Sequence, residues 1–504
     1  MALRVGGLAS GMDIESIVKD LMRAERMPLD KLQQDKQLLE WQQEDYRDIN
    51  QQVFKLRDAV FDMKLQGTYQ TKSASTSDET VLGVSATGSA TEGTYTITVN
   101  NLASGVSKAS KSELADETDV DGNTLSLFDQ FSEFTARGFA STEDITVTVN
   151  GTELTFDLDQ DNIYSVVSKI NDADVGVKAS YDKDLNRFFL TTSTTGSDTE
   201  ITITSDESNF LSNEGATYTI LKMGIGEGIS YKGQDASYDF GDAAGLTSST
   251  NMATINGLNL DLKDSGTTTV TVKSDTDAVF DKIKSFVETY NETLELVTDK
   301  TQEKRYRDYK PLTDEQKEDM SDNQIEMWEE KARSGLLKSD SIVRDVISDF
   351  RMAMSGIVEN ISGAYGSLDE IGISSRNRYD NGKLYIDEAD LKEALNKDSQ
   401  GVMDLFINNS DVDDEKGVAV KLYDAVIHSS ELITDKAGRE SSFSLVDNSY
   451  IGKRLSNMSD EINAWENRLT TVEDRYWRQF TRMEEAISRM NSQSAWLSQQ
   501  FSGA

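Results

Sequence analysis

The sequence predicts an α+β multidomain protein, in which long coiled-coil-like terminal helices bracket a helical domain and inserted antiparallel β domains. Three observations carry this prediction. Apolar residues recur at seven-residue spacing near both ends, which is typical of coiled coils. Threonine-rich segments with period-two alternation fill residues 73–275, as expected of strands, and a helical apolar stripe returns after Asp275.

The N-terminal part is expected to begin with a flexible segment over residues 1–30, because Gly6, Gly7 and Gly11 leave the backbone unrestricted. A helix is predicted over residues 31–72. Its first heptad position is apolar throughout, at Leu32, Leu39, Tyr46, Val53 and Val60.

The C-terminal part, residues 451–504, is predicted to form one long helix of roughly 75 Å. Its first heptad position carries Leu455, Ile462, Leu469, Tyr476, Met483, Met490 and Leu497. A rod of this length overruns any small domain that could bury it, so both terminal stripes are hypothesised to make self-assembly contacts. The open alternative is that they form intradomain core, as a one-sided stripe more often does.

The β-patterned middle is divided into a first β domain (73–107 plus 246–275) and an inserted second β domain (108–245). Asn150-Gly151 and Asn256-Gly257 each separate two alternating segments, which predicts hairpins with type I′ turns. A short helix is expected over residues 162–172.

Residues 276–450 are predicted to form a mainly helical domain. Its first helix carries the apolar stripe Phe280, Ile283, Val287, Tyr290, Leu294 and Val297. Shorter helices are expected at 314–335, 341–358, 388–397 and 400–407.

The net charge of −38 is unevenly distributed along the chain. Residues 1–72 carry 12 acidic and 11 basic residues, and residues 450–504 carry 7 of each, so the excess acid lies between them. An acidic body repels nucleic acid, and no apolar run is long enough to predict a membrane span. The balanced ends can pack against copies of themselves without strong repulsion.

Signals for catalysis, metals or cofactors are weak, and none of these is predicted. The chain has no cysteine and one histidine, His428, in a helical pattern that suggests a solvated position. Asp119 to Asn123 begins like a calcium loop, but the glutamate expected later is missing, so an acidic turn is the preferred interpretation.

Several segments resemble the flagellar hook-associated protein 2 (FliD) family of filament cap proteins. Residues 5–32, with Gly7 to Asp13 and Pro28-Leu29, are similar to the start of that family. The similarity continues in chain order at residues 93–104, 255–279, 286–291, 309–340, 366–374 and 382–395. Residues 108–162 and 197–250 are the least family-like.

The resemblance implies a structural cap at the distal end of the bacterial flagellar filament, with a homo-oligomer, pentameric by preference, that promotes folding and insertion of exported flagellin. It also implies flagellar type III export, an extracellular location, and flagellin, the hook–filament junction protein and an export chaperone as partners. The terminal helices would be legs that contact neighbours and the filament. A surface adhesin acting through the β domains is the alternative.

Overall fold

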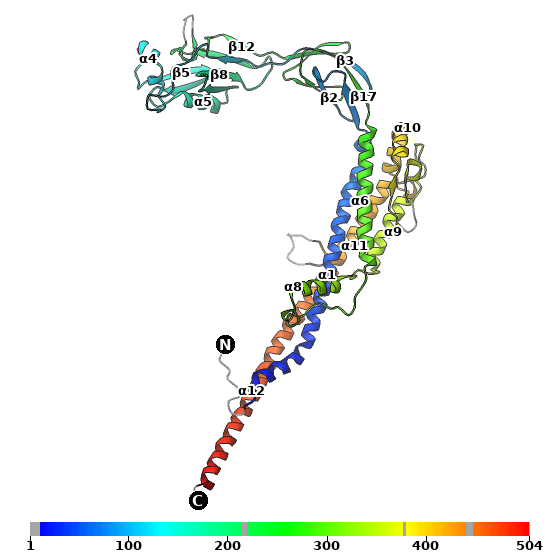
Figure 1. Ribbon diagram of the computed structural model, residues 1–504. Helices are drawn as coiled ribbons and strands as arrows, with labels where there is room; N and C mark the ends of the chain where they lie inside the picture. Colours follow the sequence, from blue (N-terminus) through cyan, green and yellow to red (C-terminus); the bar gives the residue numbers. More distant parts are fainter. Residues whose placement is uncertain (1–10, 214–218, 376–379, 440–446, 503–504) are drawn as a thin grey trace. The chain divides into compact units, whose positions relative to one another are not determined.

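The computed structural model describes residues 11–213, 219–375, 380–439 and 447–502 (Figure 1). The chain forms two compact units, one from residues 1–69 with 276–504 and one from residues 70–275. The first is helical and the second is built of strands, so the predicted α+β class is confirmed.

The helical unit contains α1 (Ile14–Met63), α2 (Gln66–Tyr69), α6 (Thr276–Gln302), α7 (Asp314–Glu318), α8 (Asp322–Arg333), α9 (Ser341–Ser355), α10 (Glu388–Ile407), α11 (Val418–Ala437) and α12 (Tyr450–Ser502). Two 3₁₀ turns, Asp369–Ile371 and Asp413–Glu415, and the short strands β18 (Ile373–Ser374) and β19 (Tyr385–Ile386) complete it. Asp398 interrupts α10 with a non-helical backbone, which matches the two helices predicted there.

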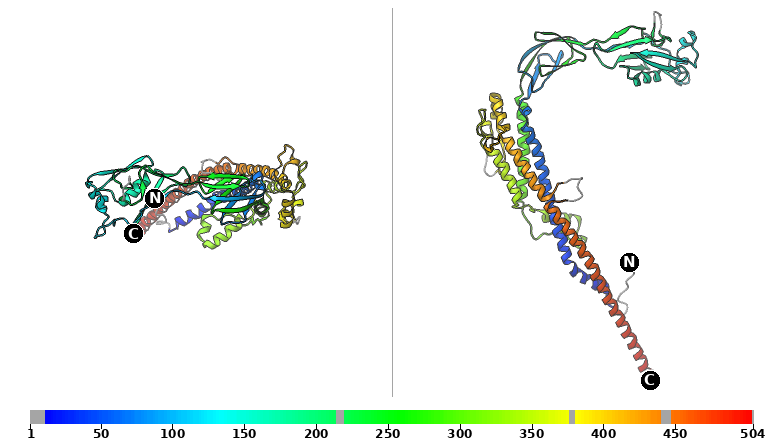
Figure 2. Two further views of the ribbon diagram at one scale, coloured as in Figure 1. Left: turned by 90° about the horizontal axis from the view of Figure 1, so that it is seen from above. Right: turned by 180° about the vertical axis from the view of Figure 1, so that it is seen from behind.

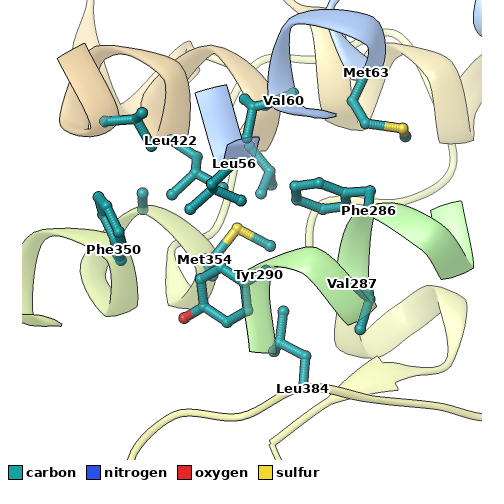
Figure 3. Close-up of a cluster of buried hydrophobic side chains, with 14 of the residues drawn as sticks. Leu56, Val60, Met63, Phe286, Val287, Tyr290, Phe350, Met354, Leu384 and Leu422 are labelled. Carbon is teal, nitrogen blue, oxygen red and sulfur yellow. The ribbon is translucent and has the colours of Figure 1, made fainter. Parts of the chain in front are cut away.

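One apolar core holds the helical unit together. It is formed by α1, α6, α9, α10 and α11, and Figure 3 shows Leu56 and Val60 of α1 lying among Phe286, Tyr290 and Leu422. All six residues of the stripe predicted for α6 are buried. The 3.6-residue apolar period therefore identified the buried face of this helix correctly.

α1 begins earlier than the sequence predicted. Residues 14–30 were expected to be flexible, but they are helical, with Asp13 accepting a hydrogen bond from the backbone N–H of Ser16. This side chain satisfies one of the unpaired amides at the helix start. Residues 1–10, with Gly6 and Gly7, lie outside the described part of the chain.

The β unit has two separate apolar cores. Around the first lie a five-stranded sheet, in the order β1 (Lys72–Thr76), β17 (Gly266–Ser274), β3 (Gly93–Asn101), β13 (Ala236–Phe240) and β14 (Ala243–Ser248), and a three-stranded sheet of β15 (Met252–Ile255), β16 (Leu258–Leu262) and β2 (Leu82–Ala86). All these pairings are antiparallel.

Around the second core lie two further antiparallel sheets. One orders β12 (Ser230–Lys232), β9 (Glu200–Ser205), β5 (Asp144–Val149) and β6 (Thr152–Asp157), and the other β4 (Ser107–Ala109), β8 (Arg187–Thr192) and β7 (Val177–Asp182). The short parallel pair β10 (Ser212–Asn213) and β11 (Ile225–Gly226) and the helices α3 (Leu127–Gln130), α4 (Ser132–Ala136) and α5 (Ile163–Asp172) complete this part.

Both predicted hairpins are confirmed, since Asn150-Gly151 and Asn256-Gly257 have positive φ at both turn positions.

One predicted border between the two β domains is wrong. Residues 236–240 were placed in the inserted domain, but β13 pairs with β3, and Ala236 and Tyr238 pack in the first core. This pairing joins segments more than a hundred residues apart, so local patterning could not reveal it.

Candidate assembly interface

The two terminal helices pair within the helical unit. α1 and α12 lie side by side in both views of Figure 2, in opposite chain directions. Leu469 and Val472 of α12 are only 6% and 8% exposed, and the Tyr476 hydroxyl donates a hydrogen bond to Glu25 of α1 at 3.1 Å. The apolar stripe of α12 therefore has a partner in its own chain over part of its length.

Asp45 ties α1 to the rest of the helical unit. Its carboxylate is 1% exposed and lies 2.7 Å from Lys300 Nζ of α6 and 3.2 Å from Arg333 Nη2 of α8. Arg333 also pairs with Glu44. Two cations compensate the buried carboxylate, as a charge in a dry environment requires.

Asp447 joins the start of α12 to α1. It accepts hydrogen bonds from Gln43 at 2.8 Å and Arg47 at 3.0 Å, and Gln43 also donates to the carbonyl of Ala437. Burial opposes ionisation of Asp447, but hydrogen bonds from Ser449 and Gln43 and the charge of Arg47 more than offset it, so its pKa lies below the ordinary value. This polar cluster fixes where α12 begins relative to α1.

The twelve predicted contact residues fall into three groups. Tyr46, Val53 and Val60 are fully buried in the helical core, so the packing of α1 accounts for this part of the stripe without a second molecule. A second group is half-buried or buried where α1 and α12 run together: Leu32, Leu39, Leu455, Ile462, Leu469, Tyr476 and Met483. Met490 and Leu497 form the third group and are 62% and 47% exposed.

A groove of about 770 Å³ opens between α1 and α12. Leu32, Leu39, Leu336, Met458 and Tyr450 are among its lining residues. Leu32 and Leu39 of the second group thus border this groove, and Leu39 also packs against the helical core.

The distal end of α12 exposes an apolar surface. Trp496 is 61% exposed and joins Met490 and Leu497 there. The sequence interpretation missed Trp496, because it stands one position before Leu497 and therefore outside the heptad stripe. It also missed Gln43, Asp45 and Asp447. Gln43 and Asp45 stand in the polar run of residues 42–45, which carries no signal that these two side chains are buried.

The two features that the sequence singled out for potential chemistry are a solvated histidine and an acidic turn. His428 is exposed on α11, as predicted. Asp119 accepts hydrogen bonds from the backbone of Asp121 and Asn123 and from the Asn123 side chain, so it closes an acidic turn. Among the described residues, no group of three or more His, Asp or Glu side chains could hold a metal ion. Within the ranges that the structure describes, no helix is long and apolar enough to cross a membrane.

Two family models match the ends of this architecture. The model of the flagellar hook-associated protein 2 N-terminus matches residues 10–105, and that of its C-terminus matches residues 233–492. The chain belongs to the flagellar hook-associated protein 2 family. The two models leave residues 106–232 unmatched, and these residues contain the second β core, so the family pattern lies in the helical unit and the first β core.

Individual members of the family are similar in sequence to this chain along nearly its whole length. The flagellar hook-associated protein 2 of Halalkalibacterium halodurans is 30% identical, over 99% of this chain and 100% of that protein. That of Thermotoga maritima is 27% identical, over 99% of this chain and 96% of its own length. The crystal structure of the flagellar cap protein FliD D1-D2-D3 domains from Escherichia coli has a TM-score of 0.53, 19% identity, and covers 82% of this chain and 99% of that one. At this identity, the structural match shows a shared fold.

Proposed function

We propose that this member of the hook-associated protein 2 family is a structural cap at the distal end of the bacterial flagellar filament, where it promotes folding and insertion of exported flagellin. Family membership supports this, as does the solved relative described as a flagellar cap protein. The cap is a homo-oligomer, with five subunits favoured, and has no enzymatic role. The chain leaves the cell by flagellar type III export, escorted by a chaperone, and contacts flagellin and the hook–filament junction protein.

The parts of the chain are proposed to have separate roles. α1 and α12 act as legs that contact neighbours and the filament, and the other helices of the same unit support them. Residues 70–275 form the body. The apolar core of the helical unit is separate from the two cores of the β unit, which supports the division between legs and body. The comparisons give no support to the alternative of a surface adhesin.

The observation that carries the proposal is the exposed apolar end of α12. Met490, Trp496 and Leu497 present three large side chains to solvent. The earlier part of the apolar stripe of α12 is covered by α1. Exposed apolar surface of this kind marks a protein contact. Contact with a neighbouring subunit or with flagellin would bury it.

The test is complementation of a strain that lacks this gene with the variant Met490→Asp/Leu497→Asp. We expect few filaments and monomeric flagellin in the medium, because a charge at each position opposes burial of the seam. Ser488→Asp is the matched control: it lies two residues from Met490, about 200° away around the helix, and is exposed. Normal filaments with the double variant, or equal loss with the control, would contradict the proposed contact.

Deleting residues 451–504 tests the proposed capping function itself. Normal filaments in that strain would overturn it.

A further inference from the structure

A pocket of about 720 Å³ lies beside α9 in the helical unit. Its lining comes mainly from α9, from residues 367–375 and from Gly382 and Leu384, and Tyr290 of α6 completes it. A cavity of this volume is within the range of sites that bind a ligand or several side chains of a partner. The proposed capping function makes no use of this pocket.

α9 turns a polar stripe toward the pocket. Arg344, Ser348, Arg351 and Ser355 all line it, and they stand four, three and four residues apart, which places them on one side of the helix. The two arginines are about 10 Å apart along the helix axis. No acid interrupts this stripe, so its two charges are both positive.

The rest of the lining combines hydroxyl groups with apolar side chains. Ser367, Ser374 and Ser375 bring the number of serines in the pocket to five. Within the described ranges, none of these five hydroxyls forms a hydrogen bond with another protein group. Figure 3 shows Met354 next to the Tyr290 ring. The apolar lining residues are Ile347, Met352, Met354, Leu368, Ile373 and Leu384.

Neither arginine has a counter-ion in the described part of the chain. The Arg344 side chain donates a hydrogen bond to the carbonyl of Asp340, in its own helix, at 3.3 Å. Asp369 is the one acid among the lining residues, and no ion pair joins it to Arg344 or Arg351. Both guanidinium groups are therefore available to an anion.

The position of Arg351 is fixed by its neighbours. Its stem packs against Gly382, where an added Cβ would lie 2.7 Å from the Arg351 Cγ. Burial raises the pKa of Tyr290, and the charge of Arg351 opposes that rise, as expected of a guanidinium near this hydroxyl. Arg351 is thus held at the pocket although it has no charged partner there.

The pocket is positive on an acidic part of the chain. Residues 275–449 carry 39 acidic and 22 basic residues. Another arginine of this unit, Arg333, pairs with both Glu44 and Asp45. The described carboxylates leave the two charges of the pocket uncompensated, so an anionic group of another molecule is the complement that they lack.

We infer that this pocket binds an acidic peptide segment of another polypeptide. The guanidinium groups bind its carboxylates, since arginine matches a carboxylate with two parallel hydrogen bonds. The serine hydroxyls bond its backbone amides and carbonyls. Apolar side chains next to the acids cover Met352, which is 63% exposed at the pocket.

Two other kinds of anion fit this lining less well. Inorganic phosphate matches the arginines but leaves the apolar lining exposed to water. A fatty acid covers the apolar lining, but its chain has no amide groups and leaves the serine hydroxyls without partners. A peptide uses all three parts of the lining.

The test uses the purified full-length chain and an acetylated, amidated pentapeptide in which leucine alternates with glutamate. Binding is followed by methyl NMR of labelled methionine, with the two pocket signals assigned by Met352→Leu and Met354→Leu. We expect both signals to shift. The same peptide with glutamine in place of glutamate should bind roughly tenfold more weakly, because the charge-assisted hydrogen bonds are lost.

Arg344→Gln/Arg351→Gln should weaken binding of the glutamate peptide by a similar factor. Arg307→Gln/Lys310→Gln is the matched control, because it removes the same charge from exposed positions of the same unit outside the pocket, and it should bind as wild type does. Circular dichroism should show the same helix content in both variants.

The inference is overturned if the glutamate peptide causes no shift, if both peptides bind equally, or if the arginine variant binds as wild type does. An equal loss in the control would assign the effect to overall charge and would also overturn it. Inorganic phosphate or octanoate that shifts both methionine signals at a lower concentration than the glutamate peptide would show a site for a simple anion or a fatty acid instead. Because the readout is peptide binding, its failure leaves the capping proposal to be judged by the filament assay.

Discussion

At the scale of single residues, Asp45 carries a prediction about stability. Its carboxylate is 1% exposed between Lys300 and Arg333. Asp45→Asn leaves two cations facing a neutral group and should lower the free energy of unfolding by about 3 kcal/mol. Glu44→Gln is the control, because Glu44 pairs with the same arginine but is half exposed, so its loss should cost at most about 1 kcal/mol. Equal losses in urea unfolding would contradict this role of burial.

Asp447 carries a prediction about pH. Its pKa is lowered in the folded chain, so it stabilises that state above the ordinary carboxyl pKa of about 3.9, and the stabilisation is lost as the pH falls through its lower folded value. Hydrogen exchange at the start of α12 should therefore accelerate as the pH falls below about 4, after correction for intrinsic exchange. Asp447→Asn should exchange faster at neutral pH and lose this acid-dependent step. A step that survives in the variant would assign it to another carboxyl.

At the scale of elements, α12 is divided into a part covered by α1 and a part that is not. Leu469→Asp places a charge in the covered part and should loosen the pairing, with faster hydrogen exchange over residues 14–30 of α1. Leu497→Asp changes an exposed position and should leave that exchange at the wild-type rate. Equal exchange in both variants would mean that α1 gains no protection from α12. Leu497 is therefore the cleaner site for testing contacts with other molecules.

The start of α1 shows what local sequence can and cannot tell. The glycines before Asp13 suggested flexibility through residue 30, whereas Asp13 as a cap and the apolar spacing of Ile14 and Val18 mark the actual start. α1 also contains Pro28 within its length. Leu29, beside the proline, is only 1% exposed, so tertiary burial outweighs the local cost of the proline.

At the scale of the whole molecule, heptad spacing predicted helices and apolar faces but not the identity of their partners. Tyr46, Val53 and Val60 pack in their own core, Leu469 packs against α1, and Leu497 is exposed, although all five occupy one type of position. The partner depends on which distant segments meet, as it does for β13 and β3. Local sequence signals were sufficient to predict elements that depend on neighbouring residues, such as the turn at Asn150-Gly151 and the helix α5.

Gly257 offers a way to perturb the β unit alone. It has φ +77°, and an added Cβ would lie 2.6 Å from the backbone N of Ala90. Gly257→Ala should therefore destabilise the first β core by about 2–4 kcal/mol. Gly151 is the control, since it has φ +82° in the same type of turn with nothing within 4 Å of a Cβ, so Gly151→Ala should cost only about 1–2 kcal/mol. Equal costs measured by circular dichroism would show that the contact with Ala90 relaxes easily.

The two compact units should unfold as separate transitions, because each has its own apolar core. All five tryptophans, Trp41, Trp328, Trp465, Trp477 and Trp496, lie in the helical unit, so their fluorescence reports on that unit alone, whereas circular dichroism at β-sheet wavelengths also follows the strands. Asp45→Asn should shift the fluorescence transition to lower urea, and Gly257→Ala should leave it in place while shifting the circular dichroism signal. Non-coincident probes are the standard sign that unfolding is not two-state. A fluorescence shift in Gly257→Ala as large as that in Asp45→Asn would mean that the two units unfold together in one transition.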